Sequence, residues 1–185
     1  VYNYLDKEKF NLYRIHIFKD KWVHVDDNEK ETPIDRNNFS IPLNGTSITF
    51  DCIFNAIHGS PGEDGLMQAY FELLGLTHTS CDFYQAALTF NKRDLLSVLK
   101  PYGIKAAPSY YLNLGDDINE NEIIEKVKLP CFVKANKSGS SYGITKVYEA
   151  KDLKSAIETA YKEDDEIIIE GFLELLLGKS WNIKF

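Results

Sequence analysis

A glycine- and serine-rich loop between two short apolar strands is the feature that most constrains this chain. Residues 131–135 (CFVKA) form a β-prone run that carries Lys134, and residues 144–148 (ITKVY) form a second one. The loop between them, residues 136–143 (NKSGSSYG), is rich in small side chains, which let consecutive backbone N–H groups converge on an anion. Lys134 and Lys137 would add positive charge, so the sequence predicts a phosphate-binding hairpin.

The topology of this loop differs from that of the better-known phosphate loops. A P-loop or a dinucleotide-binding fingerprint joins a strand to a helix, whereas this loop joins two strands and could close over a nucleotide. The alternative is a plain glycine–serine turn, which composition alone favours about two to one. Residues 178–180 (GKS) resemble the end of a P-loop, but Leu173 stands where a P-loop needs glycine, so no second phosphate loop is predicted.

Hydrophobic periodicity predicts strands and helices along the rest of the chain. The near-continuous apolar run at residues 48–57 indicates a strand buried on both faces, and residues 26–40 indicate a polar loop. A buried strand that feeds a turn and then a helix is an α/β unit. Further strands are expected at residues 12–18, 22–25, 109–112, 166–170 and, as a strand or a turn, 76–79. Helices are expected at residues 64–74, 82–88, 120–127 and 152–161, with one more that is capped by Asn91 and ended by Pro101 and Gly103.

Composition excludes several classes of function. The chain carries 28 acidic and 21 basic side chains, for a formal charge of −7, whereas sequence-independent binding to nucleic acid needs clustered Lys and Arg. No apolar run reaches the roughly 18 residues of a membrane helix. The cysteines (Cys52, Cys81 and Cys131) and the four histidines show no disulfide or zinc spacing. We therefore expect a cytoplasmic protein with no nucleic-acid or membrane partner.

Four motifs, taken together, resemble those of the D-alanine–D-alanine ligases, a family with the ATP-grasp fold. They are His58-Gly59-x-x-Gly62-Glu63-Asp64-Gly65-x-x-Gln68; Ala87-Leu88-x-x-Asn91-Lys92; Pro130-x-x-Val133-Lys134 followed by Gly139-Ser140-Ser141-x-Gly143-Ile144; and Ile168-Ile169-Glu170-Gly171-Phe172-Leu173. Each motif alone is a weak signal. The four occur in the family's order and at compatible spacing over residues 50–173, which makes their joint signal strong.

The resemblance implies an α/β protein of the ATP-grasp type. A partial amino-terminal α/β domain would cover residues 1–90, and an α+β lid domain with the glycine-loop hairpin would cover residues 91–173. The resemblance also implies an enzyme that joins two D-alanines through an acyl phosphate for peptidoglycan synthesis. It would use ATP with Mg²⁺ or Mn²⁺ and form a homodimer as the full-length enzyme.

Residues 174–185 depart from the family pattern and resemble an out-of-frame tail. On this interpretation the chain is truncated at both ends. We then expect the family's C-terminal domain, with its metal ligands, to lie beyond the chain, and the fragment to be inactive alone.

The resemblance further implies roles for single residues. Lys92 and Lys134 resemble two lysines that hold the ATP phosphates, and Ser140 resembles a catalytic loop serine that reaches the phosphate and the substrate. His58 resembles a histidine near the first D-alanine. The other ATP contacts would come from Ser141 and Gly143 in the lid loop and from the inter-strand hinge Glu170, Gly171, Phe172 and Leu173, whose backbone meets the adenine edge.

Taken singly, these residues have plainer interpretations. Lys92 alone would be a solvated lysine at a helix start about four times in five. His58 alone would be a turn or core histidine, and Glu170 alone an edge-strand carboxylate. Glu63 and Asp64 most simply favour the dipole at a helix N-terminus. For the whole chain, the alternatives are another ATP-grasp carboxylate–amine ligase, a D-alanine–D-lactate ligase, or a non-catalytic ATP-binding remnant of a disrupted gene.

Overall fold

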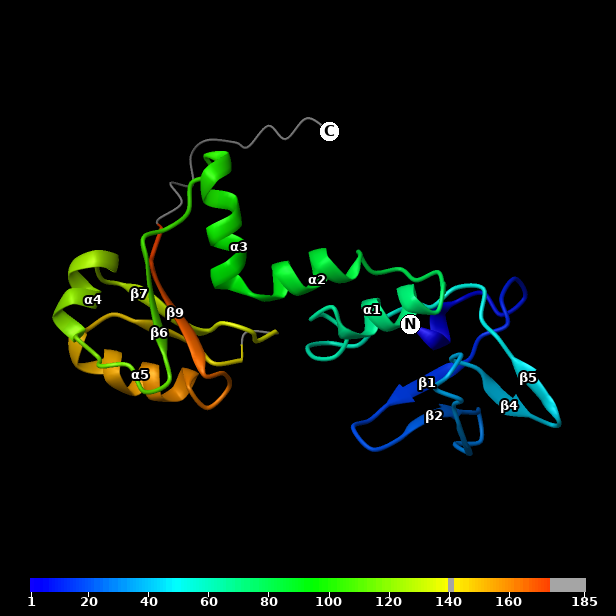
Figure 1. The fold of residues 1–185 in the computed structure, drawn as a ribbon. Helices are drawn as coiled ribbons and strands as arrows, with labels where there is room; N and C mark the ends of the chain where they lie inside the picture. The colour runs from blue at the N-terminus through cyan, green and yellow to red at the C-terminus, as the bar shows by residue number, and fades with distance from the viewer. Residues whose placement is uncertain (140–141, 174–185) are drawn as a thin grey trace. The chain divides into compact units, whose positions relative to one another are not determined.

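The computed structural model describes residues 1–139 and 142–173, and the chain divides into two compact units, Val1–Phe83 and Tyr84–Phe185 (Figure 1). The division lies at the start of helix α2 (Phe83–Phe90). The domain boundary predicted from the sequence lies after residue 90, at the other end of this helix. The first unit has a three-stranded and a two-stranded sheet, the second unit has a four-stranded sheet, and each unit has its own hydrophobic core.

Short antiparallel strands form the framework of the first unit. They are β1 (Arg14–Ile17), β2 (Trp22–Val25), β3 (Glu31–Pro33), β4 (Ile41–Leu43) and β5 (Thr46–Ile48), preceded by the 3-10 helix η1 (Tyr2–Tyr4). The first three strands form a meander, and β4 pairs with β5 in a hairpin. This hairpin turns at Asn44 and Gly45, where φ is 51° and 78°, as a two-residue type I′ turn requires.

Helix α1 (Leu66–Leu73) covers the core of this unit, close to the predicted position. It is followed by Gly75, where φ is 69° and the N–H donates to the carbonyl of Glu72 over 3.0 Å. The buried face of α1 presents Met67 and Phe71. These side chains belong to one hydrophobic cluster with Ile34, Phe39 and Ile41.

Two predictions for the first unit are wrong. Residues 26–40, expected to be loop, contain β3. The apolar run at residues 48–57 is not a buried strand, because beyond β5 it makes only one isolated parallel bridge, from Ile53 to His78, among the described residues. Its side chains alternate between half-buried and exposed, and Phe54 is 56% exposed. Apolar content alone therefore misled the prediction, since the described chain provides no strand to cover this segment.

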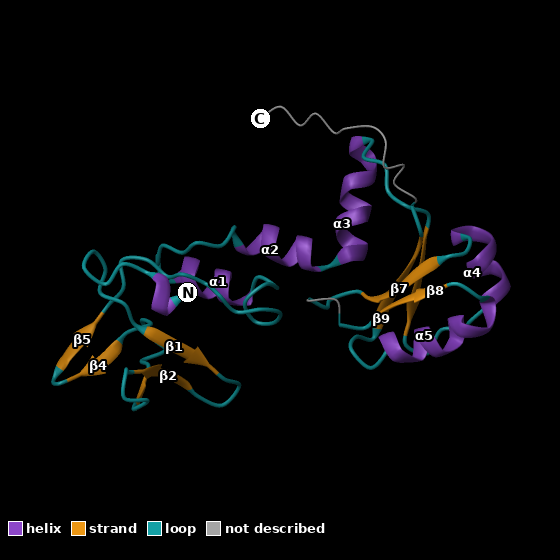
Figure 2. Ribbon diagram, turned by 180° about the vertical axis from the view of Figure 1, so that it is seen from behind, coloured by secondary structure: helices purple, strands orange, loops and turns teal. Residues whose placement is uncertain are grey.

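The second unit is a four-stranded antiparallel sheet in the order β6-β9-β7-β8. Its strands are β6 (Ser109–Asn113), β7 (Cys131–Ala135), β8 (Ile144–Val147) and β9 (Glu166–Gly171). Helices α4 (Glu120–Val127) and α5 (Leu153–Ala160) cover one face of this sheet (Figures 1 and 2). The 3-10 helix η3 (Ala150–Asp152) leads into α5. The four strands and the helices α4 and α5 lie within a few residues of their predicted positions.

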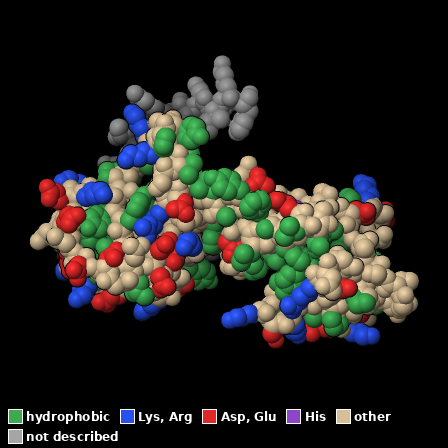
Figure 3. All heavy atoms as spheres, viewed as in Figure 1, with side chains coloured by type: hydrophobic (Ala, Val, Ile, Leu, Met, Phe, Trp, Pro, Cys, Tyr) green, Lys and Arg blue, Asp and Glu red, His purple; other side chains and the backbone are tan. Residues whose placement is uncertain are grey.

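Helix α3 (Lys92–Leu99) belongs to the same unit and follows α2. Asn91 caps it as predicted, since its side chain accepts a hydrogen bond from the backbone N–H of Asp94. The 3-10 turn η2 (Lys100–Tyr102) continues the helix, and the chain leaves it at Gly103, where φ is 74°. On the face seen in Figure 3, acidic and basic side chains are interspersed over the part of this unit that contains α4 and α5.

The close approach of β9 to α4 yields a testable prediction. A Cβ at Gly171 would lie 2.5 Å from the carbonyl oxygen of Val127, a backbone atom that cannot turn away. We expect Gly171→Ala to cost about 1–3 kcal/mol and to speed amide hydrogen exchange in β7 and β9 by about tenfold or more.

Gly103→Ala is the control, because Gly103 has a φ of 74° but open space around it, so an added Cβ meets no neighbouring atom. We expect that variant to leave exchange in β7 and β9 unchanged. Equal exchange rates in β9 for Gly171→Ala and the unaltered chain would contradict the close approach.

Candidate functional site

Strand alternation separates the two faces of the second unit's sheet. In β7 the odd-numbered residues Cys131, Val133 and Ala135 are buried against the helices, and the even-numbered ones face the other way. Lys134 therefore lies on the face that α4 and α5 do not cover. Glu170 of the neighbouring strand β9 lies there too, since the register pairs it with Phe132.

Lys134 and Glu170 form an ion pair on this face. The Lys134 Nζ contacts the Glu170 carboxylate, and the two side chains are only 24% and 16% exposed. The pair runs diagonally between strands, because Lys134 stands opposite Ile168 in the register. Glu170 is thus a partly buried counter-ion for a lysine, and the plainer interpretation as an edge-strand carboxylate is wrong, because β9 is an inner strand.

Lys92 reaches the same region from the first position of α3. Its Nζ donates to the backbone carbonyls of Asn136 over 2.9 Å and Ser138 over 2.8 Å, both at the base of the glycine-rich loop. Burial lowers the pKa of the Lys92 ammonium, and the positive charge of Lys134 lowers it further. Lys92 is therefore not the solvated helix-start lysine of the plainer interpretation.

The described part of the glycine-rich loop is closed by short-range hydrogen bonds. The N–H of Ala135 donates to the carbonyl of Gly143 over 3.2 Å, and the Ser138 hydroxyl donates to the carbonyl of Tyr142 over 3.0 Å. Gly143 has a φ of 66°, and a Cβ there would lie 2.9 Å from Glu163 Cγ and 3.1 Å from Ala135 Cβ, so the position requires glycine. The predicted site residues Ser140 and Ser141 lie outside the described residues.

Acidic side chains from the turn before β9 and from its first residue hold the base of this loop. The Lys137 ammonium lies 3.1 Å from the Glu166 carboxylate, and the Lys137 backbone N–H donates to Asp164 Oδ2 over 2.6 Å. Hydrogen bonds from Lys137 and Asn136 lower the pKa of Glu166. Asn136 is not among the predicted site residues, although a polar residue directly after a buried strand was the available signal.

The hinge after β9 has part of its backbone already engaged. The N–H of Gly171 donates to the carbonyl of Pro108 over 2.9 Å, and that of Phe172 donates to the carbonyl of Pro130 over 3.0 Å. The Lys146 ammonium lies 3.8 Å from the centroid of the Phe172 ring. An adenine edge would therefore find these two amides occupied.

His58 belongs to the first unit, and its side chain is 85% exposed. Its Nδ1 lies 3.9 Å from Glu63 Oε1. The Glu63 carboxylate accepts a 2.6 Å hydrogen bond from the N–H of Gly59, which closes the loop between them. Because α1 begins at Leu66, Glu63 holds this loop rather than lying in the first turn of the helix.

Two residues of the first motif, Gly62 and Gln68, are joined by a hydrogen bond. The Gln68 side chain is buried, and its Nε2 donates to the carbonyl of Gly62 over 2.7 Å. The same carbonyl accepts from the Asn55 side chain over 2.8 Å. A Cβ at Gly62 would lie 2.4 Å from the Cβ of Ile57, so the glycine is required sterically.

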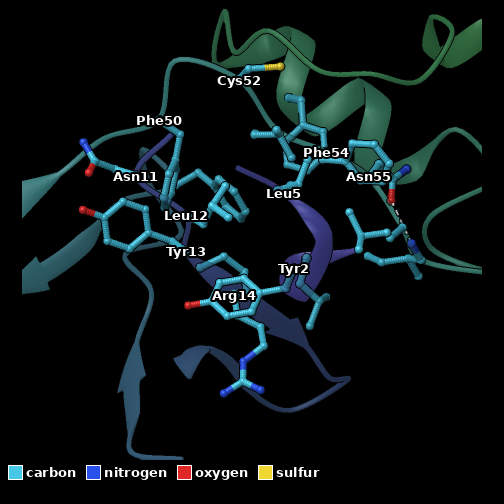
Figure 4. Close-up of a pocket in the computed structure, with 18 residues that line it drawn as sticks. Tyr2, Leu5, Asn11, Leu12, Tyr13, Arg14, Phe50, Cys52, Phe54 and Asn55 are labelled. Carbon is cyan, nitrogen blue, oxygen red and sulfur yellow. Dashed lines mark hydrogen bonds between the residues drawn. The ribbon is translucent and has the colours of Figure 1, made fainter. Parts of the chain in front are cut away.

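A cavity of about 330 Å³ lies in the first unit (Figure 4). Aromatic and aliphatic side chains line most of it, among them Leu12, Tyr13 and Phe50, and Figure 4 shows Tyr2 next to Arg14. None of the predicted site residues that the structure describes lines it.

Over residues 1–139 and 142–173, no group of three or more His, Cys, Asp or Glu side chains is arranged to hold a metal ion. In the same part of the chain, no helix has the length and apolar character needed to cross a membrane.

Comparison with known proteins shows that the chain is similar to ligases. A family model described as the D-ala D-ala ligase C-terminus matches residues 98–176. The D-alanine–D-alanine ligase of Flavobacterium johnsoniae is 72% identical over 174 residues, which are 94% of this chain and 54% of that protein. Over nearly its whole length the chain is thus similar to part of a D-alanine–D-alanine ligase. It is also 57% identical to the ligase of Christiangramia forsetii, of which it covers 53%.

The chain spans about half the length of the curated relatives it matches. Among solved structures, the D-alanine–D-alanine ligase from Coxiella burnetii superposes with a TM-score of 0.79 at 24% identity, over 92% of this chain and 56% of that one. This likeness confirms the predicted ATP-grasp type of fold.

The electrostatics of Lys92 can be tested by following its side chain in an NMR titration. We expect a midpoint below the ordinary lysine value of about 10.4. The unfolded chain then binds this proton more tightly, so the group's contribution to the free energy of unfolding rises with pH between the two pKa values. Replacing Lys134 with Met should move the midpoint upward part of the way, since burial remains.

Lys154→Met is the control, because Lys154 is exposed on α5. It should leave the Lys92 midpoint unchanged. A midpoint that also stays unchanged in a folded Lys134→Met variant would contradict the electrostatic coupling of the two lysines.

Proposed function

We propose that this chain is the ATP-phosphate-binding part of an enzyme that joins two D-alanines for peptidoglycan synthesis. The proposal rests on one observation: the Lys92 ammonium is bound at the base of the glycine-rich loop, close enough to Lys134 for the two charges to interact. One ammonium group from β7 and one from the start of α3 suit a polyphosphate. The names of the most similar relatives supply the substrate.

The chemistry explains why such a site needs cations rather than a protein nucleophile. A carboxylate is a poor acyl donor, so the first D-alanine is phosphorylated by ATP to an acyl phosphate. The amine of the second D-alanine then attacks the carbonyl carbon, and phosphate leaves. Phosphoryl transfer depends on positioning and on neutralising the developing charge. In this proposal Lys92 and Lys134 do so, and Glu170 holds Lys134 in place.

The other predicted site residues have roles in the same proposal. Ser140 reaches the phosphate and substrate as the catalytic serine, Ser141 and Gly143 shape the lid loop, and His58 lies near the first D-alanine. The adenine edge meets the hinge of Glu170, Gly171, Phe172 and Leu173. Since the first two amides after Glu170 are engaged by proline carbonyls, we assign the donor for the base to Leu173.

The divalent ion and the cellular setting are also proposals. ATP-dependent ligation needs Mg²⁺ or Mn²⁺, but the described residues provide no ligand group for either ion, so we derive no step through the metal. We propose that the intact enzyme is a cytoplasmic homodimer. The free thiols of Cys52, Cys81 and Cys131 are compatible with a reducing compartment.

The decisive experiment completes the chain with the parts of the Flavobacterium johnsoniae ligase that it does not cover. At 72% identity, we expect this chimera to fold as one enzyme. The chimera should release phosphate from ATP and form D-alanyl-D-alanine when D-alanine is present, and L-alanine should not replace it. The chain alone should form no dipeptide.

Two outcomes would reject the proposal. One is a chimera that folds and binds ATP yet forms no dipeptide from D-alanine. The other is a chimera that uses D-lactate in preference to D-alanine as the second substrate.

Lys134→Ala tests the phosphate role within that chimera. Loss of a charged hydrogen bond of about 1.5–3 kcal/mol should lower kcat/KM for ATP by about 10- to 150-fold. Lys154→Ala, on the exposed side of α5, is the control and should have little effect. Unchanged ATP kinetics in Lys134→Ala would show that Lys134 does not bind the ATP phosphates.

A further inference from the structure

The side-chain amide of Asn136 is completely buried at the start of the glycine-rich loop, with 0% exposure. A buried amide is costly unless its donors and acceptor are paired. Here Nδ2 donates to Asn91 Oδ1 over 2.9 Å and to Glu166 Oε2 over 2.7 Å, and Oδ1 accepts from the backbone N–H of Arg93 over 2.9 Å. The amide thus joins three segments: the loop, the start of α3 and the start of β9.

These partners fix the orientation of the amide. If it were turned over, its oxygen would face two oxygen acceptors, Asn91 Oδ1 and Glu166 Oε2, and its NH₂ would face the N–H of Arg93. An aspartate would fit the same space but would put a carboxylate oxygen against the Glu166 carboxylate. The site therefore selects asparagine by hydrogen-bond polarity rather than by size.

The same residue also holds Lys92 through its backbone. The carbonyl oxygen of Asn136 accepts from the Lys92 ammonium, while its side chain binds Asn91 and Arg93 on either side of that lysine. Asn91 in turn caps α3 by accepting from the N–H of Asp94 over 3.1 Å. Asn136 therefore contacts three consecutive residues at the start of α3.

We infer that Asn136 is the positioning residue of the phosphate site, because it holds the Lys92 ammonium at the base of the glycine-rich loop beside Lys134. This inference rests on the proposed function, in which the two lysines bind the ATP phosphates. Asn136 itself contacts no substrate. It acts by orienting the residue that does.

Asn136→Asp in the completed chimera is the direct test. We expect the KM for ATP to rise by about tenfold or more, with the KM for D-alanine changed by less than about twofold. Glu166→Gln, added to this variant, gives the new carboxylate a donor in place of a like charge. It should lower the KM for ATP again by about threefold or more.

Asn121→Asp is the matched control, because it makes the same chemical change at an exposed position of α4. It should leave the KM for ATP unchanged. The inference is overturned if the unaltered chimera uses ATP and D-alanine while folded Asn136→Asp keeps its KM for ATP within about twofold. It is also overturned if Glu166→Gln fails to relieve the defect. An inactive unaltered chimera would instead reject the proposed function.

A measurement on the unaltered chimera covers the case in which Asn136→Asp does not fold. The Arg93 amide can exchange only when its hydrogen bond to Asn136 opens. If that opening disrupts the phosphate site, ATP at 100 times its Kd should slow Arg93 exchange by about 100-fold. The amides of α4 that exchange by their own local opening should keep their rates. No slowing at Arg93 would overturn the inference.

Discussion

The two-residue alternation of β7 and β9 is the constraint on which the second unit depends. Residues Cys131, Val133, Ile167 and Ile169 are fully buried in the core with α4 and α5. The residues that alternate with them along each strand lie on the opposite face of the sheet, where Lys134 and Glu170 form their ion pair. A shift of register by one residue would turn the charged pair toward α4 and α5 and the core side chains away from them, so the packing of the unit also determines the placement of its site.

Neighbouring groups balance the two positive charges of the site. Lys92 and Lys134 repel each other, and both are partly buried. Glu170 offsets this repulsion at Lys134, while two backbone carbonyls solvate Lys92. Each ammonium group is therefore oriented by fixed protein partners, as is expected of groups that must bind a phosphate in a defined geometry.

Sequence reasoning predicted the second unit better than the first. Helix α4 and strand β7 have the predicted bounds, because clear capping and a short apolar run define them. The 48–57 segment was predicted as a buried strand, since composition cannot indicate whether a partner strand exists to cover it. Lys92 and Lys134 were selected from motifs. Asn136 was missed because its importance comes from partners that are 30 to 45 positions away in sequence.

The two carbonyls that bind Lys92 also have a kinetic consequence. They belong to residues 136 and 138, so the helix start and the loop base are connected by two bonds from a single ammonium group. Any motion that lifts the loop base away must either carry α3 with it or break both bonds at once. Charged hydrogen bonds of this kind contribute about 1.5–3 kcal/mol each. The rate at which the loop base separates from the helix is then governed by a residue outside the loop, and deprotonating that lysine would accelerate the motion.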